Sequence, residues 1–172
     1  EKKLGDILFN TGIDEKKAVA QSGFSLKALE SAAARINALG GRATVMDVLG
    51  MMSGMSFKSR NEFIANLASL KKEEVNDFAH EASAVGAAMD RNQVIMLLAS
   101  TNSVDRAAFI KNAATKDEVT TYTNALKNFN LPADATQAFM ALTSMNAENR
   151  GKFLGEIPNT LKQKDAFLAQ VA

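Results

Sequence analysis

Apolar residues recur along this chain of 172 residues with the spacing of amphipathic helices. Three segments share the apolar pattern i, i+3, i+7, i+10, which places its members on one face of a helix. These residues are Leu29, Ala32, Ile36 and Leu39; then Val75, Phe78, Ala82 and Val85; and then Val119, Tyr122, Leu126 and Phe129. The chain has no alternating run of β-branched residues that would predict a strand. The pattern therefore predicts an all-α protein.

A second pattern repeats around an arginine. The motif Arg-x-x-Phe, followed by an aliphatic residue, occurs three times, with the arginines 46 and then 44 residues apart. Its copies are Arg60, Phe63 and Ile64; Arg106, Phe109 and Ile110; and Arg150, Phe153 and Leu154. An apolar i, i+3 pair precedes each copy: Leu49 and Met52, Ile95 and Leu98, and Phe139 and Leu142. A period of this length is typical of stacked structural repeats.

Each repeat is predicted to contain three helices. The first helices are expected at about 43–54, 90–101 and 133–144, the second at about 57–68, 103–114 and 147–157, and the third at about 25–39, 71–85 and 116–130. Third helices are expected to stop at Gly40-Gly41, Gly86 and Asn130, because a left-handed C-cap favours Gly or Asn. The expected N-caps of second helices are Ser56, Asn102 and Asn146, and Pro132 and Pro158 are expected to interrupt helices.

These helices predict a single domain of about four repeats of about 45 residues, at about 1–41, 42–87, 88–131 and 132–172. Three helices per repeat at this length resemble the armadillo architecture, so a right-handed α-solenoid-like stack is expected. No diagnostic motif of that family is present, so the resemblance implies no function. A closed bundle of duplicated repeats is the alternative.

The first repeat is expected to be incomplete. Leu4, Ile7 and Leu8 are expected to form a shortened first helix, and Asp14 stands where the arginine would be. Because the chain opens with Glu1 rather than Met, a segment upstream is expected to have been removed: a tag, a leader or the rest of a longer protein.

Composition narrows the classes of function. Apolar residues make up 47% of the chain and charged residues 23%, which is typical of a soluble globular protein and excludes a disordered one. The net charge of +1 gives no long-range electrostatic attraction of the whole protein to DNA or to an anionic membrane. The apolar run at 94–99 is far too short to span a bilayer. The absence of cysteine excludes disulfides and thiolate sites. A soluble protein is expected, cytoplasmic or bacterial extracytoplasmic, and the Ala- and Asn-rich composition favours a bacterial origin.

The three repeated arginines, Arg60, Arg106 and Arg150, form the first candidate site, called here the Arg stripe. Each lies near the start of a second helix, where the helix dipole disfavours a cation by about 0.3–1 kcal/mol. Such a position implies a compensating partner. One interpretation is a structural ladder, in which each arginine pairs with an acidic residue or C-terminal carbonyls of the adjacent repeat. The other is a surface that binds carboxylates or phosphates of a partner.

Other candidates are weaker. Asn66 and Asn112 also repeat, with Glu156 in the third copy, and could hold an extended peptide backbone; the alternative is the polar face of a helix. Met51, Met52 and Met55 could bind Cu(I) through thioethers, but Met52 occupies a repeated core position, so core or contact surface is the preferred interpretation. The repeated phenylalanines are expected in the core. The single histidine, His80, is expected to be at the surface or half-buried, and the charged first turns at 71–74 and 116–118 are expected to be solvated.

These features predict a non-enzymatic protein–protein interaction module, a scaffold or a structural component of a larger assembly, with a protein partner and no metal or cofactor. The alternative is nucleic-acid binding through the Arg stripe, with Lys58, Lys111 and Lys152 nearby. Lys111 and Lys152 occupy different repeat positions, which weakens that alternative. No nucleophile, cofactor or phosphate-loop motif supports an enzyme.

Overall fold

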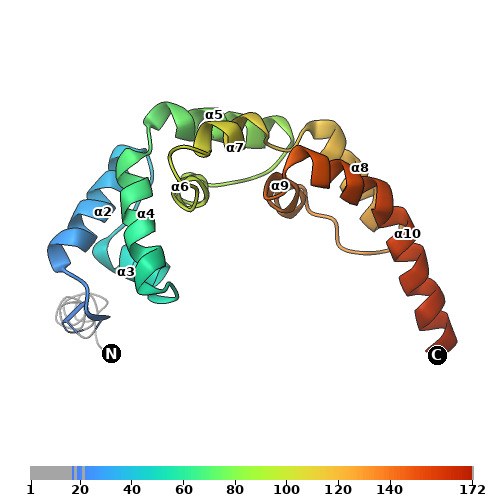
Figure 1. Cartoon of the computed structure of the whole chain (residues 1–172), viewed down its shortest axis with the longest axis horizontal. Helices are drawn as coiled ribbons and strands as arrows, with labels where there is room; N and C mark the ends of the chain where they lie inside the picture. Colours follow the sequence, from blue (N-terminus) through green and yellow to red (C-terminus); the bar gives the residue numbers. More distant parts are fainter. Residues whose placement is uncertain (1–16, 18, 21, 172) are drawn as a thin grey trace, which may run out of the picture. The chain divides into compact units, whose positions relative to one another are not determined.

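The computed structural model describes residue 17, residues 19–20 and residues 22–171, and the regular elements in this part are α-helices (Figure 1). They are α2 (Leu26–Ala38), α3 (Val45–Ser53), α4 (Phe57–Ser69), α5 (Lys72–Ala84), α6 (Arg91–Ala99), α7 (Arg106–Lys111), α8 (Lys116–Asn128), α9 (Ala135–Thr143) and α10 (Ala147–Val171). The predicted all-α class is confirmed for the described residues. None of these helices is both long and apolar enough to cross a bilayer. The expected helix around Leu4, Ile7 and Leu8 lies outside the described residues.

Helices predicted to be equivalent have equal lengths in two of the three classes. The first helices α3, α6 and α9 each have 9 residues, and the third helices α2, α5 and α8 each have 13. Their observed ends agree with the predicted ends to within two residues. The second helices differ from one another, with 13 residues in α4, 6 in α7 and 25 in α10. The sequence pattern therefore predicts the lengths of the second helices less well than those of the first and third helices.

The third helices end in three matching C-terminal turns. Gly40, Gly86 and Asn130 have positive φ angles of 92°, 79° and 54°, which confirms the predicted left-handed caps. The next residue in each turn donates its N–H to the carbonyl five residues earlier. These bonds run from Gly41 to Ile36 at 3.0 Å, from Ala87 to Ala82 at 2.9 Å, and from Leu131 to Leu126 at 2.9 Å. This pairing is the Schellman motif, which satisfies carbonyls that the helix leaves without a donor.

The predicted N-caps of the second helices are correct in two of three copies. The Ser56 hydroxyl accepts from the Ser59 N–H at 3.2 Å, and the Asn146 side chain accepts from the Asn149 N–H at 2.8 Å. The prediction for Asn102 is wrong, because residues 103–105 form a turn and α7 begins only at Arg106. The N-cap position of α7 is occupied by Asp105, whose backbone is already in the right-handed helical region.

The two prolines behave differently. Pro132 precedes α9 by three residues, in the break after α8, as predicted. The prediction that Pro158 interrupts a helix is wrong, because Pro158 lies inside α10. A proline inside a helix removes one backbone hydrogen bond. Pro158 is exposed, so water can reach this side of α10, and the lost bond does not end the helix.

The structure divides into two compact units. The first comprises residues up to Val75 together with Arg91–Ser103, and it contains α2, α3, α4 and α6. In it, α2 packs on α3 and on α4, and α4 packs on α6. The largest fully buried apolar residues of this unit are Leu29, Ile36, Leu39, Met52, Leu67, Leu70, Ile95 and Leu98. They include the expected core position Met52, which is confirmed.

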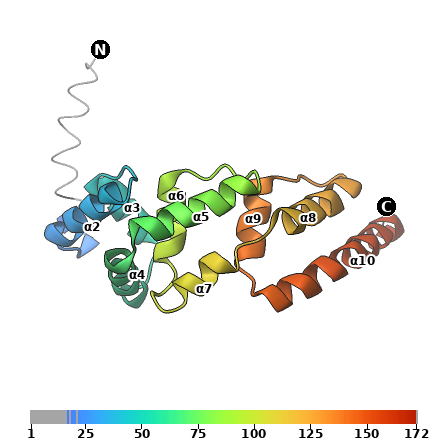
Figure 2. The ribbon, with the colours of Figure 1, turned by 90° about the horizontal axis from the view of Figure 1, so that it is seen from above.

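The second unit comprises Asn76–Asp90, which includes most of α5, and the residues from Val104 onward. Here α8 packs on α9 and lies beside α10 (Figure 2). Phe78 is fully buried and lies 5.6 Å from the Phe109 ring and 5.4 Å from the Phe139 ring, measured between centroids. Of the repeated phenylalanines, Phe63 is buried, while Phe109 and Phe153 are half-buried. The expected surface position of His80 is confirmed.

Each unit contains one side-chain clamp at the same repeat position. In the first unit, Asn92, the second residue of α6, accepts from the Arg42 N–H at 2.8 Å and donates to the Arg42 carbonyl at 2.6 Å. In the second unit, Thr136, the second residue of α9, accepts from the Ala88 N–H at 2.8 Å. Arg42 and Ala88 both stand two residues after the left-handed glycine of their Schellman turn. These clamps tie the start of α6 to the turn after α2, and the start of α9 to the turn after α5.

The tight packing at Gly41 gives the first prediction. A Cβ at Gly41 would lie 2.5 Å from Asn92 Oδ1, 2.7 Å from Ile36 Cγ2 and 2.9 Å from Ile95 Cδ1, so Gly41→Ala must displace the clamp. We expect its free energy of unfolding to fall by about 1–3 kcal/mol. Gly50→Ala is the matched control, because nothing lies within 4 Å of its Cβ and α3 gains about 0.5–1 kcal/mol of helix propensity. Urea denaturation followed by circular dichroism measures both, and an unchanged Gly41→Ala protein would contradict the prediction.

Candidate functional site

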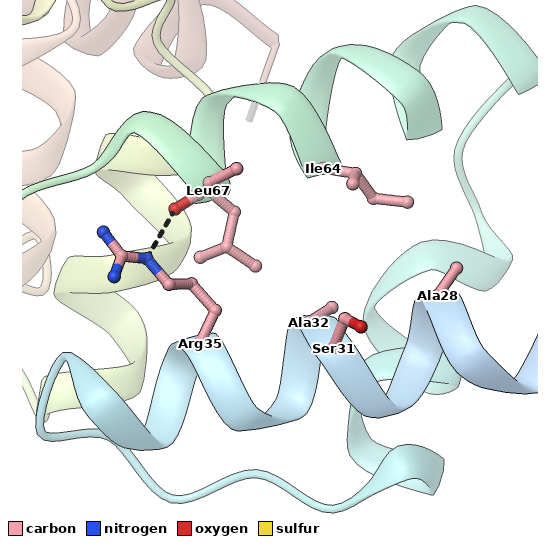
Figure 3. A pocket seen from close by; sticks show the side chains of 7 residues that line it. Ala28, Ser31, Ala32, Arg35, Ile64 and Leu67 are labelled. Atoms are coloured by element: carbon pink, nitrogen blue, oxygen red, sulfur yellow. Dashed lines mark hydrogen bonds between the residues drawn. The ribbon is translucent and has the colours of Figure 1, made fainter.

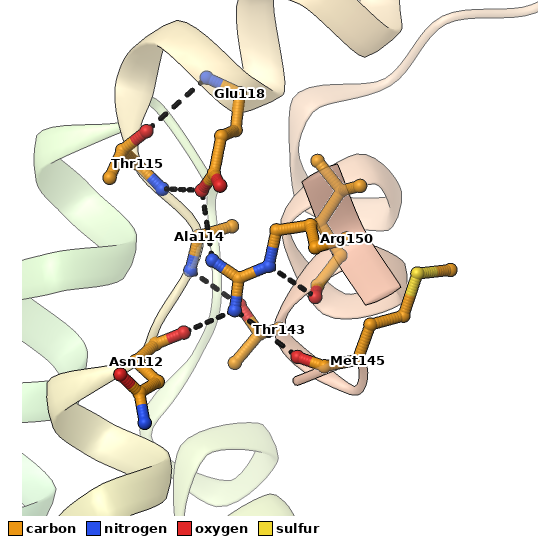
Figure 4. Close-up of polar contacts among 8 residues, drawn as sticks. Asn112, Ala114, Thr115, Glu118, Thr143, Met145 and Arg150 are labelled. Atoms are coloured by element: carbon orange, nitrogen blue, oxygen red, sulfur yellow. Dashed lines mark hydrogen bonds and ion pairs between the residues drawn. The ribbon is translucent and has the colours of Figure 1, made fainter. Parts of the chain in front are cut away.

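Arg150 is the centre of a polar network in the second unit (Figure 4). Its side chain is 3% exposed, and Nη1 lies 2.8 Å from Glu118 Oε2. Nε donates to the Leu142 carbonyl at 2.9 Å, and Nη2 donates to the Met145 carbonyl at 3.2 Å and to the Asn112 carbonyl. The guanidinium therefore joins the ends of α7 and α9 to the start of α8.

This geometry explains why an arginine occupies the unfavourable start of a helix. Arg150 lies in the first turn of α10, but its guanidinium reaches the C-terminal carbonyls of α9, the negative end of that helix dipole. Arg60 does the same in the first unit, since its Nε donates to the Met52 carbonyl of α3 at 3.2 Å. Its guanidinium carbon also lies 4.5 Å from the centre of the Phe24 ring.

The three members of the Arg stripe differ in exposure. Arg106 and Arg150 are 1% and 2% exposed, whereas Arg60 is half-buried. A guanidinium that is buried and bonded inside its own unit, as in Arg150, is out of reach of a partner's carboxylate or phosphate. The burial favours the interpretation of the arginines as structural residues, and their role in binding a partner stays a prediction.

Glu118 belongs to the Arg150 network, a role that the sequence analysis missed. Its side chain is 26% exposed and pairs with Arg150, so the expectation of a fully solvated first turn at 116–118 is wrong for this residue. Burial by itself would raise the pKa of Glu118. Hydrogen bonds from the Thr115 N–H and from Arg150 outweigh that effect and hold the pKa below its ordinary value. The available signal was Thr115-x-x-Glu118, a capping box that the structure forms in full.

The two candidate asparagines lie in different surroundings. Asn112 is exposed at the end of α7, and its main-chain carbonyl accepts from Arg150. Asn66 is half-buried in α4 and lines a cavity of about 220 Å³ together with Met55 and Phe63. The structure thus brings Asn112 to the Arg150 network through its backbone. Peptide binding by either side chain stays a prediction.

Further side chains, also missed from sequence, bind main-chain groups at helix ends. Arg35 of α2 donates through Nε to the Leu67 carbonyl at 3.4 Å and through Nη2 to the Leu70 carbonyl, at the end of α4. Arg91 donates to the Leu39 carbonyl at 3.3 Å, and the buried Thr143 hydroxyl accepts from the Ala114 N–H at 3.0 Å. Apolar periodicity contains no signal for such residues, because their partners are main-chain atoms.

A groove lies between α2 and α4 in the first unit (Figure 3). It has a volume of about 300 Å³ and is lined by Ala28, Ser31, Ala32, Arg35, Ile64, Leu67 and Ala68. The lining is apolar except at Ser31 and at Arg35, whose guanidinium is engaged at the end of α4.

A second groove lies between α5 and α7 in the second unit. It has a volume of about 530 Å³ and is lined by Asp77, Glu81, Ala84, Val85, Ile110, Lys111, Ala113, Thr115 and Lys116. Four of its residues stand 46 positions after residues of the first groove; the pairs are Ser31 and Asp77, Arg35 and Glu81, Ile64 and Ile110, and Leu67 and Ala113. The two grooves therefore share four lining positions 46 residues apart along the chain, and they differ in charge.

The described part of the chain contains no cluster of three or more His, Cys, Asp or Glu residues that could hold a metal ion. Of the candidate thioether ligands, Met52 is fully buried in the core of the first unit, and Met51 and Met55 are half-buried.

The Arg150 network gives the second prediction. Arg150→Ala leaves Glu118 and three main-chain carbonyls without their donor, so the free energy of unfolding should fall by about 3 kcal/mol. Arg60→Ala removes one bond to a carbonyl and one contact with an aromatic ring at a half-buried site, and should cost about 1–2 kcal/mol. Chemical denaturation of the two variants measures the difference. Equal losses would show that Arg150 is no more important to stability than Arg60.

The depressed pKa of Glu118 gives the third prediction. A carboxyl group whose pKa is lowered in the folded state stabilises the fold above its ordinary pKa of 4.5, and this contribution is lost as the pH falls through the folded value. The stability difference between wild type and Glu118→Gln should therefore be constant near neutral pH and shrink below about pH 4.5. In an Arg150→Ala background the same difference should be smaller, because only the N–H and the side chain of Thr115 still stabilise the charge. A difference that does not change with pH would contradict this role.

No protein-family model, no curated protein and no solved structure matches this chain.

Proposed function

We propose that this chain is a non-enzymatic protein–protein interaction module, built as an α-solenoid-like array of about four armadillo-like three-helix repeats. Three kinds of recurrence support the repeats. Helices of matching length begin 46 and then 44 residues apart, Schellman turns end the third helices at Gly40, Gly86 and Asn130, and the clamps of Asn92 and Thr136 stand at equal positions. Agreement of helix lengths, turns and side-chain clamps is what a duplicated supersecondary unit would produce.

The observation that carries the functional proposal is the pair of equivalent grooves. The frame around them repeats, whereas the charged residues in their walls change from Arg35 in the first unit to Glu81 in the second. A constant frame with variable lining is how repeat proteins build a specific binding surface. The lining is therefore where we place partner recognition.

Nucleic-acid binding through the Arg stripe is the less favoured alternative. It needs accessible guanidinium groups, and Arg106 and Arg150 are 1% and 2% exposed. The net charge of +1 also gives little long-range attraction to a polyanion.

A selection experiment tests the proposal. The full chain is immobilised and panned against a displayed peptide library, and in parallel it is titrated at low salt with single- and double-stranded oligonucleotides. We expect saturable binding of selected peptides and no oligonucleotide binding. Arg60→Ala is the control variant, because it removes the one arginine of the stripe that solvent can reach and lines neither groove. Oligonucleotide binding that falls steeply with salt and is lost in Arg60→Ala would overturn the proposal, as would failure to select any peptide.

A further inference from the structure

We propose that the groove between α5 and α7 docks an amphipathic helix of another protein, one whose apolar stripe runs between a basic edge and an acidic edge. This inference rests on the proposed function and names its partner class. It is carried by the way apolar and charged side chains are distributed across that groove.

The two walls of the groove carry opposite charges. Asp77 and Glu81 stand one turn apart on α5, and both are exposed. Lys111 at the end of α7 and Lys116 at the start of α8 line the same groove and are also exposed. Among the residues that the structure describes, none of these four takes part in an ion pair. The groove thus presents two carboxylates and two ammonium groups that a partner can still pair with.

Apolar side chains also line the groove. Val85 and Ile110 are half-buried, and Ala84 and Ala113 add small apolar surfaces. Phe109 of α7 stacks on the buried Phe78 of α5, so an aromatic contact joins the two helices between which the groove lies. An apolar surface that is only half covered favours a ligand that brings its own apolar side chains.

Comparison with the equivalent groove shows that these charges are not required by the fold. Arg35 occupies the position that corresponds to Glu81, and its guanidinium holds the end of α4 through the Leu67 and Leu70 carbonyls. Glu81, a carboxylate, cannot donate to a carbonyl, so it cannot serve that purpose. Glu81 therefore does not perform the structural role that Arg35 performs at the corresponding position. This difference is consistent with a role of Glu81 in binding a partner.

The chemistry of the groove selects a helix as the occupant. An amphipathic helix lays its apolar residues into a hydrophobic groove, with flanking charged residues left to pair with the rims. Asp77 and Glu81 have i, i+4 spacing, which two lysines or arginines one turn apart on a helix can match. A nucleic acid would bring phosphates against these two carboxylates. An extended peptide would find no sheet edge to extend in the described part of the chain.

The test is a selection with charge-randomised helical peptides on the full chain. The displayed peptides have fixed apolar positions at i, i+3, i+4 and i+7, and their edges are randomised among Lys, Glu, Gln and Ala. We expect enrichment of sequences with lysine on one edge and glutamate on the other. When the selection is repeated on the Glu81→Lys protein, the enriched peptides should carry glutamate on the edge that is basic in the wild-type selection. Reversal of one rim charge should weaken binding of the wild-type winner roughly five- to tenfold, because like charges then face each other.

Glu30→Lys is the matched control. Glu30 is an exposed glutamate in the middle of a third helix, α2, and it lines neither groove, so the substitution makes the same change in net charge elsewhere. Binding of the winner should be unchanged in this variant. A peptide designed with glutamate in place of its basic edge should recover affinity for the Glu81→Lys protein.

The outcomes separate the two proposals. One outcome is that the selected peptides bind the Glu81→Lys and Lys111→Glu proteins as tightly as they bind the Glu30→Lys protein. In that case the chain is a binding module and the groove assignment is wrong. If the winners carry charges of one sign only, or uncharged edges, the assigned partner class is wrong. If no peptide of any kind is selected here or from the unrestricted library, both proposals fail.

Discussion

The main-chain carbonyls at the ends of short helices are the constraint on which this structure depends. A helix leaves about four carbonyls and four N–H groups without an internal partner, and α3, α6 and α9 have only 9 residues each. Nearly every residue in such a helix therefore needs a partner from outside. Arginines provide some of them: Arg60 donates to the Met52 carbonyl of α3, and Arg150 donates to the Leu142 carbonyl of α9. Arg91 makes the same kind of bond to the Leu39 carbonyl at the end of the longer α2.

This arrangement separates the residues that hold the helices together from those that line the grooves. The end contacts and the buried apolar faces position each helix pair, so side chains on the groove walls can vary without disturbing the packing. Arg35 belongs to both sets, because it lines one groove and also holds the end of α4. Glu81 at the equivalent place belongs only to the groove lining. The second groove is therefore the one whose charges are most readily assigned to recognition.

Sequence reasoning succeeded where the determining interaction is local. The apolar periodicity and the glycines or asparagine at Gly40, Gly86 and Asn130 act within one helix and its cap, so they could be recognised without a structure. It failed at Pro158, where solvent exposure lets a helix continue through a residue that usually ends one. It also missed Glu118 and left the Arg150 partners open. Those partners lie 5 to 38 residues away along the chain and are brought together only by the fold.

The arginine contacts have a consequence for how such a chain can diverge. In four of them, made by Arg35, Arg60, Arg91 and Arg150, the acceptor is a main-chain oxygen, which every amino acid carries, so no exchange of the acceptor residue removes it. Only a substitution of the arginine itself removes such a bond. An ion pair or an apolar contact can be broken from either side and must be maintained at two positions. A chain held together in this way can therefore change many of its side chains while the same few donors continue to define where each helix ends.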